Sequence, residues 1–152
     1  MANLNYLFVY SGWLDQKRLK KELPNAQFIT TGTCEDYCLQ FADYQDDNGK
    51  EHQAGDLMEK VSGEMLYGAI WKIEEEELYH MDESLKLHSG EYRREYRAVM
   101  GQDGKPYAVT AFSVKHPVKK VKPRQDEAEN LMAGANVFGF PEDYIKKIKT
   151  IC

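Results

Sequence analysis

One short turn carries residue types that can do chemistry: Tyr10, Ser11, Gly12 and Trp13. The aromatic and β-branched run before it is typical of a buried strand, and the leucines after it recur at helical spacing up to Pro24. A strand, a tight turn and a helix bring backbone N–H groups together at the helix start, where an anionic group is stabilised. The turn is therefore a candidate place for a ligand, and its alternative is a simple connection between strand and helix. Trp13 has two interpretations, a lid over a pocket or an anchor for the helix.

Strand signals dominate the next part of the chain. Residues 26–44 alternate well enough for one long strand or two short strands, which close at the polar turn 45–51. Residues 54–73 predict a hairpin broken at Ser62-Gly63. Residues 91–100 and 107–114 predict a second hairpin around a Gly-rich turn.

Helix signals are fewer. Residues 74–87 begin with four glutamates, which suit the positive end of a helix dipole. Residues 126–136 and the segment opened by Pro141 predict two helices near the C-terminus. Many strands with few interspersed helices favour an α+β fold, a small barrel or curved sheet.

Composition excludes several classes of protein. The 152 residues fit a single domain over 1–152, and the net charge of −5 argues against nucleic acid as a partner, although residues 115–124 are locally basic and predict a solvated edge strand or loop. Three cysteines without paired spacing predict neither a disulfide framework nor a zinc site. Without a long apolar segment or a signal peptide, we expect no membrane partner and a cytoplasmic location. The sequence does not indicate an oligomeric state.

Six segments in order carry a resemblance over nearly the whole chain. They are "YLFVY" with its turn, "H..AG" from His52, "LYGAIWKI", "LYHMDES", "SGEYRREYRAV" and "MAGANVFGFPEDYIKKI". Together they resemble the γ-glutamylcyclotransferase family, with its AIG2-like and γ-glutamylamine cyclotransferase branches. The resemblance implies a single mixed β-barrel with flanking helices. It also implies a reaction in which a glutamyl amine attacks its own side-chain carbonyl, expels an amine and forms 5-oxoproline.

That reaction needs a proton-transfer group and donors for the developing oxyanion. In the family, a Glu after the helix and the loop after the first strand serve these roles, and here both segments depart from the pattern. The family order Gly-Ser appears as Ser11-Gly12, which displaces a glycine that would allow a positive φ. Asp82 matches the family Asp, but Leu85 stands where the catalytic Glu is expected. Leucine cannot transfer a proton.

Two carboxylates are candidates to replace the missing group, and both are proposed as catalytic residues. Glu91 lies directly before Tyr92 in a Gly-Glu-Tyr sequence that some bacterial branches of the family share; its alternative is an exposed residue paired with Arg93 or Arg94. Glu83 lies two residues from the lost position, which on a helix is about 200° away. We favour Glu91.

The predicted substrate-binding residues are Tyr10, Ser11, Gly12, Trp13, Leu85 and Tyr92. Asp56 can face the barrel interior only if it has partners there, so a position on the hairpin surface is favoured. No spacing of the four histidines predicts a metal site, and no dinucleotide fingerprint or P-loop is present, so no metal and no cofactor are expected.

Two classes of function follow. The first is a divergent cyclotransferase-like enzyme acting on a γ-glutamyl amide or a related small amine-bearing substrate, in the same pocket and with its reaction either retained or changed. The second is a binding protein that has kept the barrel and its pocket but lost the chemistry. Both take a small molecule as partner, and we favour the enzyme because the scaffold of the site is retained.

Overall fold

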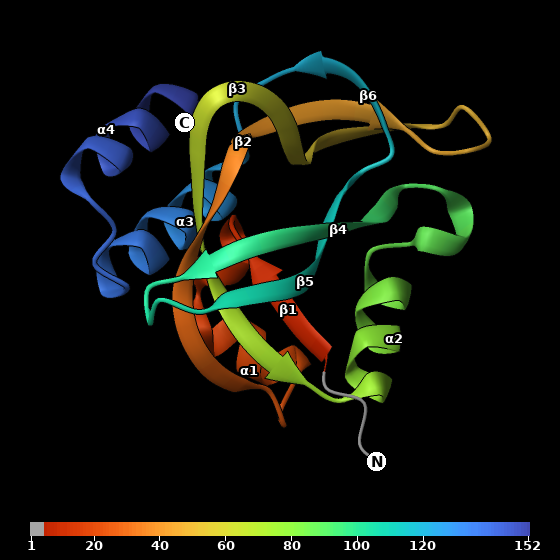
Figure 1. Ribbon diagram of the computed structural model, residues 1–152. Helices are drawn as coiled ribbons and strands as arrows, with labels where there is room; N and C mark the ends of the chain where they lie inside the picture. Colours follow the sequence, from red (N-terminus) through yellow and green to blue (C-terminus); the bar gives the residue numbers. More distant parts are fainter. Residues whose placement is uncertain (1–4) are drawn as a thin grey trace.

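The computed structural model describes residues 5–152 and shows a mixed β-barrel with four α-helices around it (Figure 1). Five strands close the ring in the order β3-β1-β5-β4-β2, with β2 returning to β3, and β6 extends the edge of β2. The strands are β1 (Asn5–Val9), β2 (Gln27–Gln45), β3 (Glu51–Ile73), β4 (Tyr92–Gly101), β5 (Pro106–Val114) and β6 (His116–Lys120). The β1–β5 pair is parallel and the others are antiparallel, which confirms the predicted mixed barrel.

The long strands β2 and β3 form one hairpin closed by the polar turn 46–50. The predicted hairpin at Ser62-Gly63 is wrong, because β3 runs through both residues without a break. Gly63 has a φ of 85° and its N–H donates to Oδ1 of Asp36, which itself has a φ of 65°, at 2.9 Å. The pairing register shifts between Glu35 and Tyr37, beside this contact. The glycine therefore serves a β-bulge that bends the ribbon.

The second predicted hairpin is present as β4 and β5, paired from Tyr92–Val114 to Met100–Pro106.

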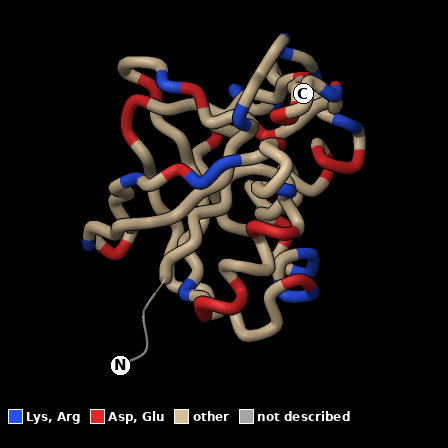
Figure 2. The backbone as a smooth tube through the Cα atoms, turned by 90° about the vertical axis from the view of Figure 1, so that its right-hand side faces the viewer, with Lys and Arg blue, Asp and Glu red and all other residues tan. Residues whose placement is uncertain are grey.

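The basic segment forms β6, whose five residues are all exposed along the edge of β2. Charged residues of both signs interleave along the chain (Figure 2). The exposed, lysine-containing β6 protects an open edge of the sheet.

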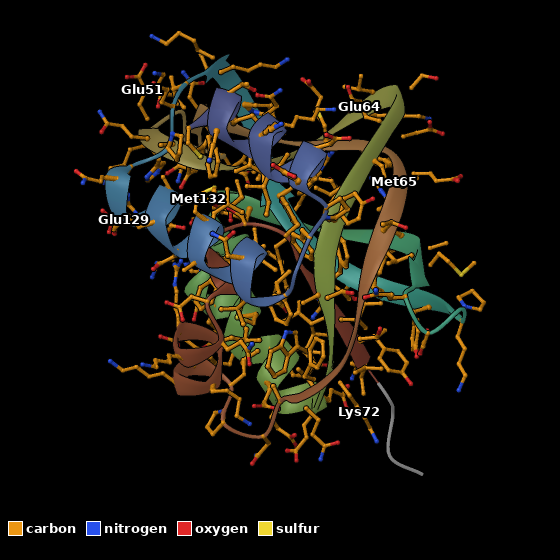
Figure 3. The ribbon with its side chains drawn as sticks, turned by 90° about the vertical axis from the view of Figure 1, so that its left-hand side faces the viewer. Glu51, Glu64, Met65, Lys72, Glu129 and Met132 are labelled. Atoms are coloured by element: carbon orange, nitrogen blue, oxygen red, sulfur yellow. The ribbon has the colours of Figure 1, made fainter. Side chains whose placement is uncertain are left out.

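The helices are α1 (Gln16–Glu22), α2 (Glu75–Ser84), α3 (Gln125–Val137) and α4 (Glu142–Ile151). Glu74 and Glu77 form a capping box at the start of α2, which explains why the acidic run begins a helix. Helices α3 and α4 lie on one side of the barrel and α2 lies on the other (Figure 1). In Figure 3, which looks onto that first side, Met132 lies on α3, and Glu64 and Met65 lie on β3.

The core fills the barrel and the space beneath the helices. Its largest fully buried side chains come from β1, α1, β2, β3, α2, α3 and α4, among them Phe8, Phe41, Leu66 and Ile70. Among the described residues, no helix is long and apolar enough to cross a membrane.

Candidate functional site

The end of β1 leads into a one-turn 3-10 helix, Gly12–Leu14, which buries Ser11 and Gly12. Ser11 has a φ of −130°, and Gly12 is not among the described glycines with positive φ. The expected left-handed glycine is therefore absent at this turn. Position 12 requires glycine for a steric reason instead, because a Cβ there would overlap the Glu127 carboxylate and approach the Arg18 guanidinium.

The Ser11 hydroxyl donates a hydrogen bond to Oδ1 of Asp56 across the turn at 2.7 Å. The backbone N–H of Asp56 donates to the Tyr92 hydroxyl at 2.9 Å, which fixes this part of β3 against β4. The predicted surface position of Asp56 is therefore wrong. Its partly buried carboxyl lies at the cavity beside the first turn, where Ser11 supplies the hydrogen-bond partner that such an acid requires.

The environment of Asp56 changes its acidity. Burial raises the pKa of its carboxyl to about 6, and the neighbouring Glu127 carboxylate acts in the same direction. The hydrogen bond from Ser11 and the Arg18 and Arg124 guanidinium groups partly oppose that increase. A carboxyl with a pKa near neutrality can both accept and return a proton, as general acid-base catalysis requires.

Leu85, the residue at the expected Glu position, lines the same cavity as Ser11 and Asp56. The remaining wall is mostly apolar, with Leu7, Phe8, Val9, Tyr10, Trp13, Met81 and Phe112. The cavity has a volume of about 20 Å³, enough for a single water molecule. Side chains at its rim must therefore move before a larger ligand can enter.

Trp13 lines this cavity, and Arg18 packs against the Trp13 ring. The guanidinium carbon of Arg18 is 3.9 Å from the centre of the Trp13 ring, and its Nη1 forms an ion pair with Glu127 at 2.9 Å. Glu127 is 8% exposed, so its carboxylate charge needs compensation, which Arg18 and the more distant Arg124 provide. Sequence reasoning missed both members of the Arg18–Glu127 pair.

Glu91, the favoured proton-transfer residue, belongs to an adjacent cluster and is not among the residues lining the cavity. Its Oε1 accepts a hydrogen bond from the Tyr44 hydroxyl at 3.1 Å and lies 3.6 Å from Nδ1 of His52. The other ring nitrogen of His52 lies 3.2 Å from Asp46. Burial and the Glu91 carboxylate raise the pKa of Tyr44, so this tyrosine stays a hydrogen-bond donor. The edge of Tyr44 meets Tyr92, which connects the cluster to Asp56.

The other predicted residues are placed as follows. Glu83 is exposed on α2 and outside the cavity. Asp82 forms a bidentate ion pair with Arg94, with contacts of 2.9 and 2.5 Å, that fastens α2 to β4. Tyr10 is buried and its hydroxyl donates to the Phe112 carbonyl at 2.5 Å, so it has a packing role in this structure. Burial, with Asp56 nearby, raises the pKa of Tyr92.

No group of His, Cys, Asp and Glu side chains in residues 5–152 has the geometry to hold a metal ion.

The closed mixed barrel with its surrounding helices is the gamma-glutamyl cyclotransferase-like fold. The structure superimposes on a solved gamma-glutamyl cyclotransferase with a TM-score of 0.87 at 24% identity, covering 99% of this chain and 89% of the other. An uncharacterized protein from Homo sapiens gives a TM-score of 0.86 at 24% identity over 98% of this chain and 88% of the other. These likenesses confirm the predicted fold.

The sequence comparisons identify the family. The model of the AIG2-like family matches residues 65–148, and the chain belongs to that family. It is 24% identical over 145 residues to the gamma-glutamylcyclotransferase of Bos taurus, which covers 95% of this chain and 77% of that protein. The gamma-glutamylcyclotransferase of Homo sapiens matches with the same identity and coverage.

Proposed function

We propose that this chain is a divergent cyclotransferase that converts a γ-glutamyl amide, or a related small amine-bearing substrate, to 5-oxoproline and a free amine. One observation carries the proposal: Asp56, whose pKa burial raises to about 6, lines the cavity that Ser11 and Leu85 also line. We infer from it that Asp56 takes the role that the family gives to a glutamate. The relatedness to gamma-glutamylcyclotransferases supports the reaction class.

In this reaction Asp56 takes a proton from the α-ammonium group of the substrate. The freed amine attacks the γ-carbonyl carbon. As the new C–N bond forms, the attacking nitrogen releases a second proton to solvent water, because Asp56 already carries the first. The Asp56 carboxyl returns its proton to the departing nitrogen, so that the old C–N bond breaks and the amine leaves, to be protonated in water. Ser11 holds the Asp56 carboxyl in place throughout.

The oxyanion that forms on the γ-carbonyl needs hydrogen-bond donors. The backbone N–H groups of Gly12 and Trp13 begin a 3-10 helix and have no acceptor in the described part of the chain. They lie beside Ser11 and are suited to this role. We include in this proposal the substrate-binding roles predicted from the sequence, those of Trp13 and Leu85 among them.

Glu91 enters the mechanism indirectly. Because its carboxylate accepts from Tyr44, whose ring meets Tyr92, we assign it the positioning of the wall beside Asp56. A direct proton-transfer role for Glu91 stays a prediction, and the comparison of Glu91→Gln with Asp56→Asn decides between the two carboxylates.

The test is the release of 5-oxoproline from a panel of γ-glutamyl amides, measured by mass spectrometry. We expect release by the wild type and a loss of about 10²- to 10⁴-fold in Asp56→Asn. The matched control is Asp103→Asn, which changes an exposed turn outside the cavity and leaves the rate unchanged. Equal rates in wild type and Asp56→Asn would reject Asp56.

A second function, small-molecule binding without turnover, is favoured by one observation. Leu85 and seven other apolar or aromatic side chains make most of the cavity wall. No 5-oxoproline from any amide, together with a change in Trp13 fluorescence on adding an uncharged compound, would support this function and reject the enzyme.

A further inference from the structure

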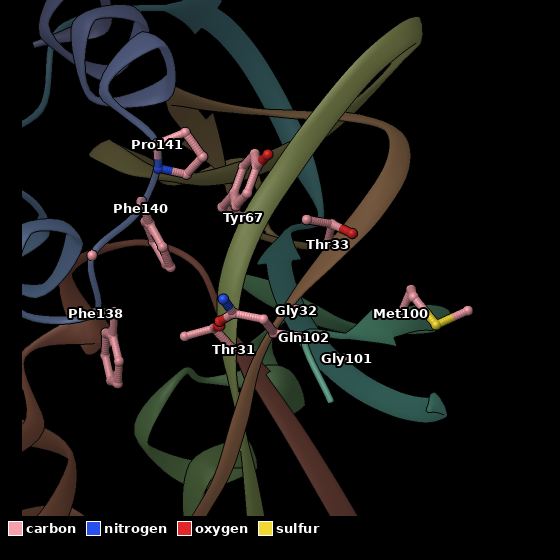
Figure 4. A pocket seen from close by; sticks show the side chains of 11 residues that line it. Thr31, Gly32, Thr33, Tyr67, Met100, Gly101, Gln102, Phe138, Phe140 and Pro141 are labelled. Carbon is pink, nitrogen blue, oxygen red and sulfur yellow. The ribbon is translucent and has the colours of Figure 1, made fainter. Parts of the chain in front are cut away.

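A second cavity, of about 320 Å³, lies on the outside of the barrel (Figure 4). It shares no lining residue with the Ser11 cavity. Its floor is a row across three neighbouring strands, in which Thr33 of β2 is paired with Tyr67 of β3 and with Met100 of β4. Phe138, Phe140 and Pro141, from the connection between α3 and α4, form the opposite wall (Figure 4).

The aromatic wall is held in place by its own packing. Phe140 is 6% exposed, and its ring lies 5.6 Å from the Tyr67 ring and 5.8 Å from the Tyr144 ring. Phe138 stacks on Phe28 at 5.2 Å, with 28° between the ring planes. A cavity with walls fixed in this way is formed before a ligand arrives, which lowers the cost of binding.

The cavity carries no charge. None of its eleven lining residues is Asp, Glu, Lys, Arg or His, although charged residues make up 30% of the chain. A charged ligand would lose its hydration here without gaining a counter-ion. The lining therefore favours an uncharged occupant.

Polar groups at the rim can hydrogen-bond to one edge of a ligand and so fix its orientation. Within residues 5–152, the hydroxyls of Thr33 and Tyr67 have no hydrogen-bond partner. The Thr31 hydroxyl donates to Oε1 of Gln102 at 2.6 Å, which leaves the amide nitrogen of Gln102 free to donate. Aromatic faces on one side with free donors and acceptors on the other match a flat ring that has a polar edge.

We propose that this cavity, defined by Tyr67, Thr33, Met100, Phe138 and Phe140, is a second binding site, and that its ligand is a small, uncharged, planar ring compound with a hydrogen-bonding edge. The proposal does not depend on the activity of the Ser11 cavity, because the two sites are formed by different residues.

Indole is a suitable probe, and indole-3-carboxylate is its charged counterpart. We expect indole to shift the backbone amide signals of Gly32, Gly101 and Gly139 in a ¹H–¹⁵N correlation spectrum, in a saturable manner. The carboxylate should bind at least about tenfold more weakly, because its charge has no partner in the cavity. Indole shifts that do not saturate, or carboxylate binding of equal strength, would overturn the proposal.

Two matched variants locate the site. Met100 is 51% exposed and lines the cavity, whereas Val137 is 71% exposed and lies outside it, so both positions tolerate a polar residue without unfolding the core. Met100→Glu should weaken indole binding about tenfold, and Val137→Glu should leave it unchanged. Equal binding by wild type and Met100→Glu would overturn the proposal, as would a wild-type dimer that Met100→Glu dissociates, because the cavity would then be covered by a second copy of the chain.

Discussion

The hydroxyl of Ser11 and Oδ1 of Asp56 lie 2.7 Å apart, although 45 positions separate the two residues in the sequence. The contact joins the first turn to the N-terminal part of β3 and places a carboxyl of raised pKa in the cavity that Leu85 lines. The proposed chemistry depends on this pair, because a proton-transfer group must be both held in place and close to neutral in its acidity.

The pH dependence of turnover is the first prediction. Only the ionised form of Asp56 accepts a proton, and burial raises the pKa of this carboxyl to about 6. We expect kcat/KM to be level above that pH and to fall about tenfold per unit below it. Ser11→Ala removes the hydrogen bond that favours the ionised form, so its profile should move to higher pH. Identical profiles for wild type and Ser11→Ala would contradict the assignment.

Stability should respond to the same carboxyl. Because the folded-state pKa of Asp56 is raised above its ordinary value of 3.8, its contribution to stability is complete below pH about 4 and is lost as the pH rises through about 6. Asp56→Asn does not titrate, so relative to the wild type its free energy of unfolding should gain on the order of 2 kcal/mol between pH 4 and pH 7. Urea unfolding at several pH values measures this gain.

Asp103→Asn serves as the control of opposite sign. The hydrogen bond from Tyr107 lowers the pKa of the Asp103 carboxyl, so its contribution is present at neutral pH and is lost on acidification. This variant should lose stability relative to the wild type as the pH rises from 3 to 7. A gain of the same sign in both variants would mean that the effect of Asp56→Asn is not due to its buried carboxyl.

Space at Gly12 is the basis of a third prediction. A Cβ there would overlap the Glu127 carboxylate, so Gly12→Ala must displace Glu127 and weaken its ion pair with Arg18. We expect a loss of about 1–3 kcal/mol in the free energy of unfolding. In the background of Glu127→Ala, which removes the overlapping carboxylate, Gly12→Ala should cost less stability than it costs in the wild type. Additive effects of the two substitutions would contradict the steric explanation.

Much of the fold was predictable, because each strand and helix carries a local signal. The aromatic run of β1, the hairpin of β4 and β5 and the acidic start of α2 all formed where expected. Ser62-Gly63 misled the prediction, because a bulge glycine and a turn glycine look alike in sequence. Gly63 differs only in its partner Asp36 on the neighbouring strand, and the register of the two strands decides that contact.

The site was less predictable, because its members meet through long-range contacts. The turn at Ser11 and the position of Leu85 could be located from sequence, and both line the cavity. Asp56 gave no local sign of burial, since the side chain that faces it comes from the turn after β1. The ion pair between Arg18 and Glu127 joins α1 to α3, and only the packing of α3 against the first turn brings them together.

The final prediction tests whether the position of Leu85 can again hold a catalytic glutamate. Leu85→Glu places a second carboxyl in the small apolar cavity that Asp56 already enters, so we expect a loss of about 1–3 kcal/mol of stability, larger at pH 8 than at pH 5 because both groups are ionised at high pH. In the background of Asp56→Asn, which removes the like charge, that loss should shrink. If the wall still supports the family reaction, the double variant should release more 5-oxoproline than Asp56→Asn alone. Leu85→Gln is the control, since it has the size of glutamate without a proton to transfer. Equal 5-oxoproline release from the Glu and Gln double variants would show that a carboxyl at position 85 no longer reaches the substrate. Asp56 would then act from a different position in the cavity than the family glutamate.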